Sequence, residues 1–521
     1  MTSPRTATRL FAVGVSLTML TAACGLKNEA TDSLKSPTGA VTGTAGGTTG
    51  TGATGTGVTG SPTGTGVVGT GSAGGTTGGT VASGPGGTVA PGAAGGNTST
   101  GGGTTAGSNG GSTGGGAKPA SGSCGVPSGG DTTGITAKNI NIGLHAPLTG
   151  TGTPFPNSSF QKGAGTFWQQ PGHTVCGRTV KVEFQDDTYT PAGARNVCSP
   201  MAKRDFFVVG GGGTDQIQAC ATDPDIQRLG VPYLSAGVTD NGLTSLSNYF
   251  AVSLTYAQQG TLVLNNAKAH GFANPPASQV ASDNITGKKA EWAIVTGSSP
   301  NFAGARDGIE KALTQAGIPY KNYPVDQNGN YQAAATQFGQ QLALNGFQTV
   351  FVDAAPGYFV FMTGGFYGAH VGNANWVGPG VTYTEVTVAQ YICTTTKSAI
   401  NGHAWFLAPA PGLDHATEDF KKAYNGKYDD IEWALWGLSE TLWHLMQNAS
   451  GNLTRQNFIA STEASKLPAG TVYPPVDFAD HGGHFGGTAA WVQRVNCNTT
   501  EPDQNQPGGW DTIGSNYLRL F

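Results

Sequence analysis

The sequence predicts an α/β protein with two lobes, each built around a parallel sheet. From about residue 139 onward, short apolar stretches rich in β-branched and aromatic residues alternate with helix-like stretches, and the alternation occurs in two sets. This rhythm is typical of βαβ units, whose helices cover both faces of a parallel sheet. The region is also long enough for two hydrophobic cores rather than one.

The first set predicts four strands separated by helices. "NINIGL" is a short β-branched stretch, "RTVKVEFQDD" alternates apolar and polar residues, and "DFFVVG" is a continuous apolar run of the kind buried on both faces of a sheet. "VPYLSAG" is the fourth strand. Asn157 is a suitable N-cap for the first helix, Pro191 suits the first turn of the second, and Pro224 should break the third.

The second set repeats this pattern. "EWAIVTG" predicts a strand, and "NFAGARDGIEKALTQAG" predicts a helix that ends at Gly317. A helix over "YQAAATQFGQQLALNG", a strand over "FQTVFVDAA" and a helix over "PGYFVFMTGGFYGAHV" follow. The last strands are expected in "ANWVG" and "HAWFLA".

The N-terminus predicts export and lipid anchoring. Arg5 and Arg9 precede a mostly apolar run, 10–20, that is too short for a comfortable membrane span. "LTAAC" then ends at Cys24 and resembles a bacterial lipoprotein signal, in which the cysteine is lipidated and becomes the mature N-terminus. An ordinary secretory signal cut near Ala23 is the alternative. Two acyl chains on one cysteine would hold the protein at a membrane without a transmembrane helix.

The segment after Cys24 predicts a flexible tether. More than a third of the 84 glycines of the chain lie between residues 41 and 120, where the only charge is Lys118 and no aromatic residue occurs. Such a segment cannot bury enough apolar surface to offset the entropy of ordering it, so we expect it to be disordered. The net charge of -4 gives no electrostatic reason to expect a nucleic-acid partner.

Four consecutive glycines, 210–213, stand between the strand "DFFVVG" and the helix that follows. Such a loop can present backbone N–H groups and the positive end of a helix dipole to an anion. A phosphate loop is disfavoured because no Gly-Lys-Ser/Thr follows. The alternative is that the glycines only allow the strand and the helix to pack closely.

The order of these motifs resembles the type I periplasmic binding proteins that serve branched-chain amino acid and amide ABC transporters. The resemblance runs from about residue 140 to 495 and includes "INIGLHAPLTGTGTPFPNSSFQKGA", "GRTVKVEFQDDTYTPAGA", "FFVVGGGGTDQIQAC" and "NYFAVSLTYAQQG". It implies two Rossmann-like lobes joined by a multi-strand hinge. We therefore expect a signal peptide at 1–23, a lipidated cysteine and disordered tether at 24–123, a first lobe at 124–253 plus 409–485, and a second lobe at 254–408 plus 486–521.

The resemblance also implies a ligand site between the lobes. The residues that it assigns to the ligand are Thr151, Phe155, Gly213, Thr214, Asp215, Ser235, Ala236 and Gly237 in the first lobe and Ser299, Asn301, Phe302, Asp353 and Val381 in the second.

The second lobe departs from the family pattern. Amino-acid-binding members carry an acidic residue in a Gly-Pro-Glu-Gly-like loop, whereas this chain has "GPGVTYTE" there, without a carboxylate at that place. Asp353 or Glu385 would have to hold an ammonium group instead. An amino acid, an amide and an organic acid therefore all remain open as ligands.

Six cysteines besides Cys24 suggest up to three disulfides in an exported chain. Cys198 and Cys220 fall on helices after neighbouring strands, and a disulfide between these helices has parallels in the family. The pairing of Cys124, Cys176, Cys393 and Cys497 stays open, although elimination favours Cys393 with Cys497 and Cys124 with Cys176.

The enzyme-like and metal-binding alternatives are weak. His481 and His484 lie in "DFADHGGHFGG", where the glycines argue against a helix that would hold both imidazoles on one face. Asp186 and Asp187 follow a strand, where capping of a turn is expected, and Trp433, Trp436 and Trp443 form a stripe of the kind found in cores.

We expect no catalytic residue, metal or cofactor. The expected protein is a solute-binding lipoprotein on the extracytoplasmic face of the cell membrane, with a small-molecule ligand and an ABC permease as partners. A surface sensory or adhesion protein with the same fold is the alternative, and a hydrolase is a more distant one.

Overall fold

The computed structural model describes residues 127, 129–149, 157–236, 241–274, 291–327, 330–380, 384–479, 484–502 and 504–520. These residues belong to one compact unit. The predicted signal peptide, Cys24, the tether and Cys124 lie outside the described residues. Among the described helices, none combines the length and apolarity needed to cross a membrane.

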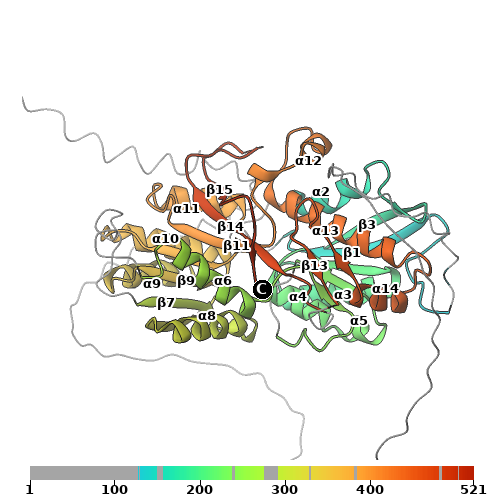
Figure 1. Cartoon of the computed structure of the whole chain (residues 1–521), viewed down its shortest axis with the longest axis horizontal. Helices are drawn as coiled ribbons and strands as arrows, with labels where there is room; N and C mark the ends of the chain where they lie inside the picture. Colours follow the sequence, from blue (N-terminus) through green and yellow to red (C-terminus); the bar gives the residue numbers. More distant parts are fainter. Residues whose placement is uncertain are drawn as a thin grey trace, which may run out of the picture. The chain divides into compact units, whose positions relative to one another are not determined.

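The first sheet follows the predicted alternation of strands and helices. Its strands lie in the order β2-β3-β1-β4-β5-β6 and are parallel, except that β2 is an antiparallel edge strand (Figure 1). The strands are β1 (Asn139–Ala146), β2 (Thr174–Val175), β3 (Arg178–Asp186), β4 (Phe207–Gly210), β5 (Tyr233–Ser235) and β6 (Tyr249–Ala251).

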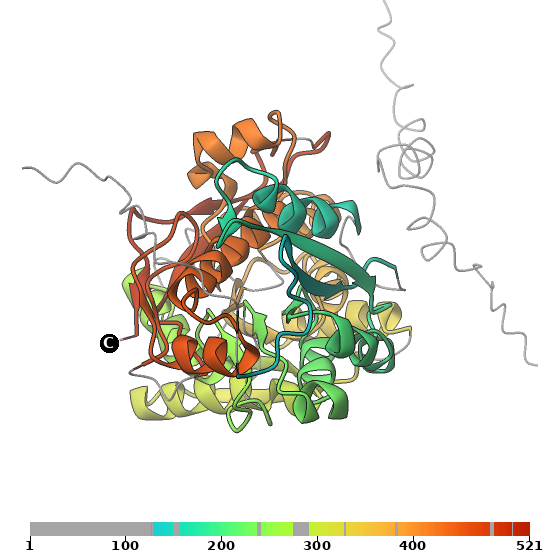
Figure 2. The ribbon, with the colours of Figure 1, turned by 90° about the vertical axis from the view of Figure 1, so that its right-hand side faces the viewer.

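Helices cover both faces of this sheet because its strands carry apolar side chains on both sides. One core joins β1 and β4 residues to helices α2 and α13, and a second core joins the opposite face to α3, α4 and α5. The C-terminal α13 thus packs on a sheet formed by N-terminal strands (Figure 2). The helices are α2 (Asn157–Trp168), α3 (Pro191–Arg204), α4 (Thr214–Ala221), α5 (Pro224–Arg228), α12 (Glu418–Ala423), α13 (Asp430–Asn448) and α14 (Arg455–Glu463).

The helix ends follow local rules of the sequence. Thr190 caps α3 by accepting the N–H of Gly193, and Pro191 stands in the first turn. The predicted break at Pro224 separates α4 from α5, and Asp223 caps α5. Asp429 starts α13 with a capping box. Of the predicted tryptophan stripe on α13, Trp433 and Trp436 are buried in the core, whereas Trp443 is only partly buried against it.

The second sheet has the order β15-β14-β11-β10-β9-β7-β8, and β16 also pairs with β14. Strands β8, β7, β9, β10 and β11 are parallel, whereas β14 is antiparallel to β11. The predicted parallel sheets are therefore mixed sheets. The strands are β7 (Trp292–Gly297), β8 (Tyr320–Val325), β9 (Thr349–Asp353), β10 (Asn375–Pro379), β11 (Ala404–Ala408), β14 (Ala489–Asn496), β15 (Gly509–Thr512) and β16 (Leu518–Arg519).

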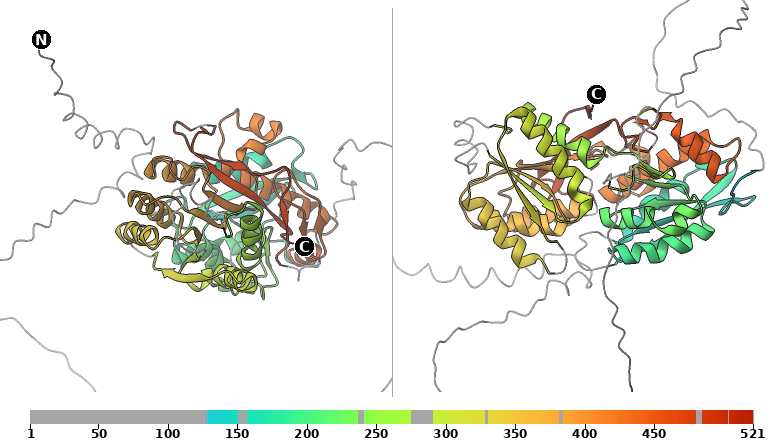
Figure 3. Two further views of the ribbon diagram at one scale, coloured as in Figure 1. Left: turned by 60° about the vertical axis from the view of Figure 1, so that its left-hand side comes forward. Right: turned by 90° about the horizontal axis from the view of Figure 1, so that it is seen from below.

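Two layers of helices also flank the second sheet. Helices α6 and α8 pack on one face, and α9, α10 and α11 pack on the other. The yellow-green and golden-yellow helices on the left of the right-hand view of Figure 3 are part of this set. Gly317 ends α8 in the left-handed conformation, as predicted. The helices are α6 (Tyr256–Ala269), η1 (Pro300–Phe302), α8 (Ala303–Ala316), α9 (Gln332–Leu344), α10 (Pro356–Gly368), α11 (Val386–Thr395) and η2 (Leu413–His415). A separate two-stranded ribbon joins β12 (Lys466–Leu467) and β13 (Val476–Asp477).

Backbone pairing joins the segments that run between the two sheets. Ala251, the last residue of β6, donates its N–H to the carbonyl of His484 and accepts the N–H of Gly486. A Cβ at Gly487 would lie 2.1 Å from the carbonyl carbon of Ser253. The segment that starts at His484 therefore needs glycine at position 487 to pack against the segment that follows β6. The stretch "NYFAVSLTYAQQG" is therefore part of the connection between the sheets.

Two disulfides are present among the described residues. Cys198 on α3 bonds to Cys220 on α4, with 5.6 Å between their Cα atoms, as predicted. Cys393 on α11 bonds to Cys497 after β14, with 5.5 Å between the Cα atoms. Cys176 is disulfide-bonded as well, and the partner expected for it, Cys124, lies outside the described residues.

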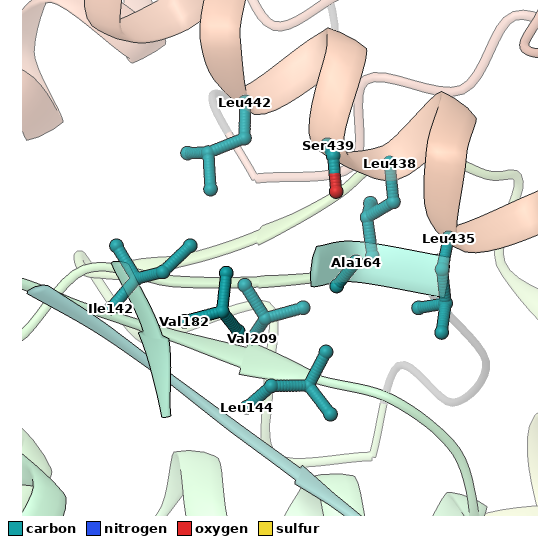
Figure 4. A pocket seen from close by; sticks show the side chains of 9 residues that line it. All are labelled: Ile142, Leu144, Ala164, Val182, Val209, Leu435, Leu438, Ser439 and Leu442. Carbon is teal, nitrogen blue, oxygen red and sulfur yellow. The ribbon is translucent and has the colours of Figure 1, made fainter. Parts of the chain in front are cut away.

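A small apolar cavity lies inside the first core, between α13 and the sheet (Figure 4). The centre of a water-sized sphere can move within about 10 Å³ of this cavity. This volume is close to the minimum that one water molecule needs. Ser439 on α13 supplies the one hydroxyl of the lining. Because the other lining side chains are aliphatic, this cavity is a packing defect rather than a solute site.

Filling this cavity should stabilise the chain. Val209→Ile adds one methylene group to a lining residue, and we expect the free energy of unfolding to rise by about 0.5–1 kcal/mol. The matched control is Val208→Ile on the opposite face of β4, where close packing should make the same addition cost about 1–3 kcal/mol. Urea unfolding of the whole chain measures both. Equal shifts of the two midpoints would contradict the assignment of the cavity.

Candidate functional site

The glycine run after β4 serves close packing at two positions. A Cβ at Gly210 would lie 2.3 Å from the hydroxyl of Tyr233, and one at Gly211 would lie 3.0 Å from the carbonyl oxygen of His145. Gly213 has φ +83° and is the N-cap residue of α4, a conformation that favours glycine. The run therefore brings the start of α4 close to the ends of β1, β4 and β5.

Thr214 and Asp215, the first two residues of α4, contact residues of the second lobe. The Thr214 hydroxyl is 3.1 Å from the hydroxyl of Tyr256, at the start of α6. Asp215 Oδ1 accepts hydrogen bonds from Ser299 Oγ at 3.1 Å and from the Asn301 amide. Asp215, Ser299 and Asn301 were all predicted as ligand residues, and the structure brings them into contact with one another.

A further bond supports this contact. Asn241, in the loop before β6, donates its side-chain amide to Asn301 Oδ1 at 2.8 Å. Asn301 is therefore held by two segments of the first lobe. Phe302, also predicted, is buried beside Gly297, where a Cβ would lie 2.7 Å from its ring.

Ser235 ends β5 and is fully buried. Its hydroxyl is 2.8 Å from the hydroxyl of Tyr249 on β6. Ala236 follows it and is half-buried. The other predicted ligand residues, Thr151, Phe155, Gly237 and Val381, lie outside the described residues.

Asp353 ends β9, at the carboxyl edge of the second sheet, and pairs in register with Thr296 of β7. Its side chain is 3% exposed, and its Oδ2 has no hydrogen-bond partner among the described residues. Burial raises the pKa of Asp353 well above its usual range. Burial also raises the pKa of Tyr256, and the charge of Asp353 adds to that rise.

Glu385 is a second buried carboxyl at this edge. It is the N-cap residue of α11, but its side chain makes no capping bond. The side chain is 8% exposed, and Oε2 has no hydrogen-bond partner among the described residues. Burial raises the pKa of Glu385, and the nearby carboxyls of Asp430 and Asp429 raise it further.

Two tyrosines near these strand ends, Tyr189 and Tyr256, were not among the ligand residues predicted from the sequence. Burial raises the pKa of Tyr189, and the charges of Tyr331, Glu385 and Asp215 add to the rise. Its φ of 54° is unusual for a residue other than glycine. The signal that could have found Tyr189 is its position in the short turn between the end of β3 and Pro191, which starts α3. We call Tyr189, Thr214, Asp215, Tyr256, Ser299, Asn301, Asp353 and Glu385 the inter-sheet site.

A buried network supports the first-lobe loops of this site. His145 Nδ1 is 2.8 Å from Asp187 Oδ2, and His145 Nε2 is 2.7 Å from the Tyr233 hydroxyl. Asp187 Oδ1 accepts the N–H of Tyr189. Asp187 therefore caps the turn, as predicted, and also binds a histidine, which the sequence did not reveal. Asp186 accepts N–H groups of three loop residues, which agrees with the predicted capping role.

Among the described residues, one cluster has potential ligand atoms close enough together to hold a metal ion: His145, Cys198 and Cys220. The two sulfurs form a disulfide, so they are not available as thiolate ligands. Of the histidine pair weighed as metal ligands, His481 lies outside the described residues, and His484 Nδ1 is 3.1 Å from the carbonyl of Tyr249.

Solved structures with the same fold include several solute-binding proteins. A fatty acid ABC transporter substrate-binding protein from Thermomonospora curvata aligns with a TM-score of 0.59 and 15% identity over 75% of this chain and 94% of that one. A solute-binding protein of an ABC transporter from Rhodopseudomonas palustris BisB5, in complex with 3,4-dihydroxybenzoic acid, aligns with a TM-score of 0.57 and 15% identity over 73% and 98%.

A third structure is the branched-chain amino acid transporter substrate-binding protein LivJ from Streptococcus pneumoniae in complex with isoleucine. It aligns with a TM-score of 0.53 and 15% identity over 72% of this chain and 99% of that one. At such identities the likeness establishes the fold alone. No curated protein matches the chain by sequence.

The family model described as periplasmic binding protein matches residues 139–502, which is more than half of the chain. The match covers the first sheet, the strands of the second sheet up to β14, and every residue of the inter-sheet site. The chain therefore belongs to the periplasmic binding protein family.

Proposed function

We propose that this protein captures a small polar solute at the inter-sheet site and delivers it to the permease of an ABC transporter. The observation that carries the proposal is the contact of Asp215, on the first lobe, with Ser299 and Asn301, on the second. Polar side chains from the carboxyl ends of both sheets thus meet at one place, where ligands bind in open α/β folds. The similar proteins bound to isoleucine and to dihydroxybenzoic acid support an amino acid or an organic acid as the solute, and an amide is the third candidate.

The roles that we propose follow from position. The backbone after Gly213 and the hydroxyls of Thr214 and Ser235 would donate to the polar end of the solute. Residues Thr151, Phe155, Ala236, Gly237, Phe302 and Val381 would complete its surroundings. Asp215, Ser299 and Asn301 would form a latch that closes the lobes over it by a hinge motion. We propose no catalytic role for any of these groups.

The proposed location is the extracytoplasmic face of the cell membrane. A lipidated Cys24 would anchor the chain, and the glycine-rich segment up to residue 123 would act as a tether. For a Gly-rich coil of that length the root-mean-square span is roughly 50–60 Å, which would let the folded part reach a permease in the same membrane.

Thermal-shift screening of amino acids, amides, organic acids and sugars tests solute capture. A solute at about 100 times its dissociation constant stabilises the folded chain by roughly 2.7 kcal/mol, which should raise Tm by several degrees.

Once a solute is found, Thr214→Val should weaken its binding about 10- to 150-fold, because the change removes one hydrogen bond and leaves a side chain of nearly the same shape. Thr222→Val at the other end of α4 is the control. A panel without any stabilising solute would count against solute capture, and equal affinities of the two variants would place the site elsewhere.

The latch can be tested by distance measurement. Asp215→Ala removes the acceptor of two hydrogen bonds, so we expect a broader distance distribution between spin labels at the exposed Asn196 on α3 and Lys311 on α8. Asp307→Ala on the exposed side of α8 is the control, because Asp307 pairs only locally with Arg306. Identical distributions for both variants would show that this contact does not hold the lobes together.

The anchor has a separate test. We expect Cys24→Ala to release the protein into the medium or to leave its signal unprocessed, because the acyl chains are the only proposed attachment. Membrane fractionation and mass spectrometry of the N-terminus measure this. Membrane association at the wild-type level in the variant would rule out lipidation at Cys24.

A further inference from the structure

A histidine lies beside the Cys198–Cys220 disulfide in the interior of the first lobe. One ring nitrogen of His145 and the two sulfurs all lie within 4.8 Å of one another. The three side chains are fully buried. They come from β1, α3 and α4, so this His–Cys cluster connects a central strand of the first sheet to two helices that cover it.

The hydrogen bonds of His145 give its ring the form that binds metals. Nδ1 is 2.8 Å from Asp187 Oδ2, and because a carboxylate oxygen only accepts hydrogen bonds, Nδ1 carries the proton. Nε2 therefore has the free lone pair, which accepts the hydroxyl of Tyr233 at 2.7 Å. A histidine that binds a metal through one nitrogen nearly always donates its other N–H to a carboxylate, a carbonyl or water. His145 already makes that supporting bond.

The spacing of the two cysteines is compatible with one tetrahedral ion. Zinc holds thiolates at about 2.3 Å, which places two of them roughly 3.8 Å apart. The Cα atoms of Cys198 and Cys220 are 5.6 Å apart, so rotation of the side chains can open this distance while the helices stay in place. Two thiolate charges offset the charge of a divalent cation, which lowers the cost of burying it. Sulfur and imidazole ligands in a tetrahedron favour zinc.

We propose that the His–Cys cluster binds Zn²⁺ when its cysteines are reduced, so that a disulfide and a metal ion are alternatives at one place. A phosphine reductant breaks the S–S bond: phosphorus takes the oxygen of one water molecule, and each sulfur takes one of its protons. When the ion binds, the two thiols release these protons to the solvent. Nε2 of His145 exchanges the Tyr233 hydroxyl for the metal, and the released hydroxyl is a candidate for the fourth ligand.

The metal would take over the structural role of the disulfide. The disulfide joins α3 to α4, and an ion held by the same sulfurs would join them too and add β1 through His145. The bonds from His145 to the neighbouring loops would remain. Its carbonyl oxygen accepts the N–H of Gly211, and Asp187, still bonded to Nδ1, accepts the N–H of Tyr189. Zinc would thus keep the two helices linked in a chain that has lost the covalent bond.

Cobalt substitution tests the cluster in the whole chain. The protein is unfolded in urea with a phosphine reductant and refolded without oxygen in the presence of Co²⁺. We expect a thiolate-to-cobalt charge-transfer band, visible bands of tetrahedral intensity, and the loss of both when Zn²⁺ is added. The chain refolded with its disulfides intact should show neither. A reduced chain that fails to refold, or that binds no cobalt through sulfur, overturns the proposal.

Cysteine variants identify the sulfurs, because the chain contains other cysteines that are also reduced. Cys198→Ser combined with Cys220→Ser should abolish the tetrahedral cobalt spectrum. The matched control is Cys393→Ser combined with Cys497→Ser, which removes the other described disulfide and should keep the spectrum. An unchanged spectrum in the first double variant would place the metal on other cysteines and refute the assignment.

A histidine variant identifies the nitrogen. His145→Gln removes the ring, and we expect the affinity for Zn²⁺ to fall roughly 10-fold or more, as measured by competition with a chelator. His415→Gln, at an exposed position, is the control and should bind Zn²⁺ like the wild-type chain. Equal affinities of the two variants would exclude His145 as a ligand.

A measurement on the wild-type chain needs no variant. The reduced chain is refolded with or without Zn²⁺ and exposed to glutathione disulfide, and peptide mapping follows each cysteine pair over time. Zinc should slow formation of the Cys198–Cys220 bond roughly 10-fold or more, because its thiolates are held by the ion. Cys393 and Cys497 belong to no such cluster in the described part of the chain, so their bond should form at the same rate in both samples. Equal effects on the two pairs would overturn the proposal.

Discussion

The pairing of Ala251 with residues 484–486 is the constraint on which the architecture depends. The chain leaves the first sheet after β6, builds most of the second sheet, and returns so that α13 and α14 cover the first sheet again. It then crosses back to add β14 and its partners to the second sheet. The late part of the chain therefore supplies two covering helices to the first sheet and strands β14 to β16 to the second. The two lobes must therefore form together, although each has its own helices and a core face of its own.

The local structure of both lobes could be predicted because it depends on short-range patterns. Strands β1, β3 and β4 carry clear apolar patterns, and the ends of the helices follow Thr190, Pro224 and Gly317. Strand β8 was not predicted, because "YKNYPV" is an edge strand with mostly exposed or half-exposed side chains. The antiparallel strands β14 to β16 were missed as well, since the alternation of strand and helix predicts only parallel neighbours.

The inter-sheet site was accessible from the sequence only in part. Asp215, Ser299 and Asn301 were assigned to the ligand by the resemblance to the family, but their mutual contact joins residues more than 80 positions apart. Such a contact depends on how two sheets face each other, which no local pattern encodes. The same holds for His145 and Asp187, which are ordinary strand-end residues in the sequence and a buried pair in the structure. For the glycine run, close packing requires glycine at Gly210 and Gly211, and Gly213 is the N-cap of α4 with a positive φ; anion binding by this loop stays a prediction.

The disulfide between Cys393 and Cys497 encloses a long part of the chain. Its two cysteines lie beside the second sheet, yet the 104 positions that separate them include α12, α13 and α14, which belong to the first. The disulfide thus closes residues 393–497 into a covalent loop. A protease that cuts once within it would leave both fragments joined through sulfur, and the nicked protein would migrate as one species until a reductant was added. Damage to the helices that cover the first sheet would then be invisible to any assay of covalent integrity under oxidising conditions.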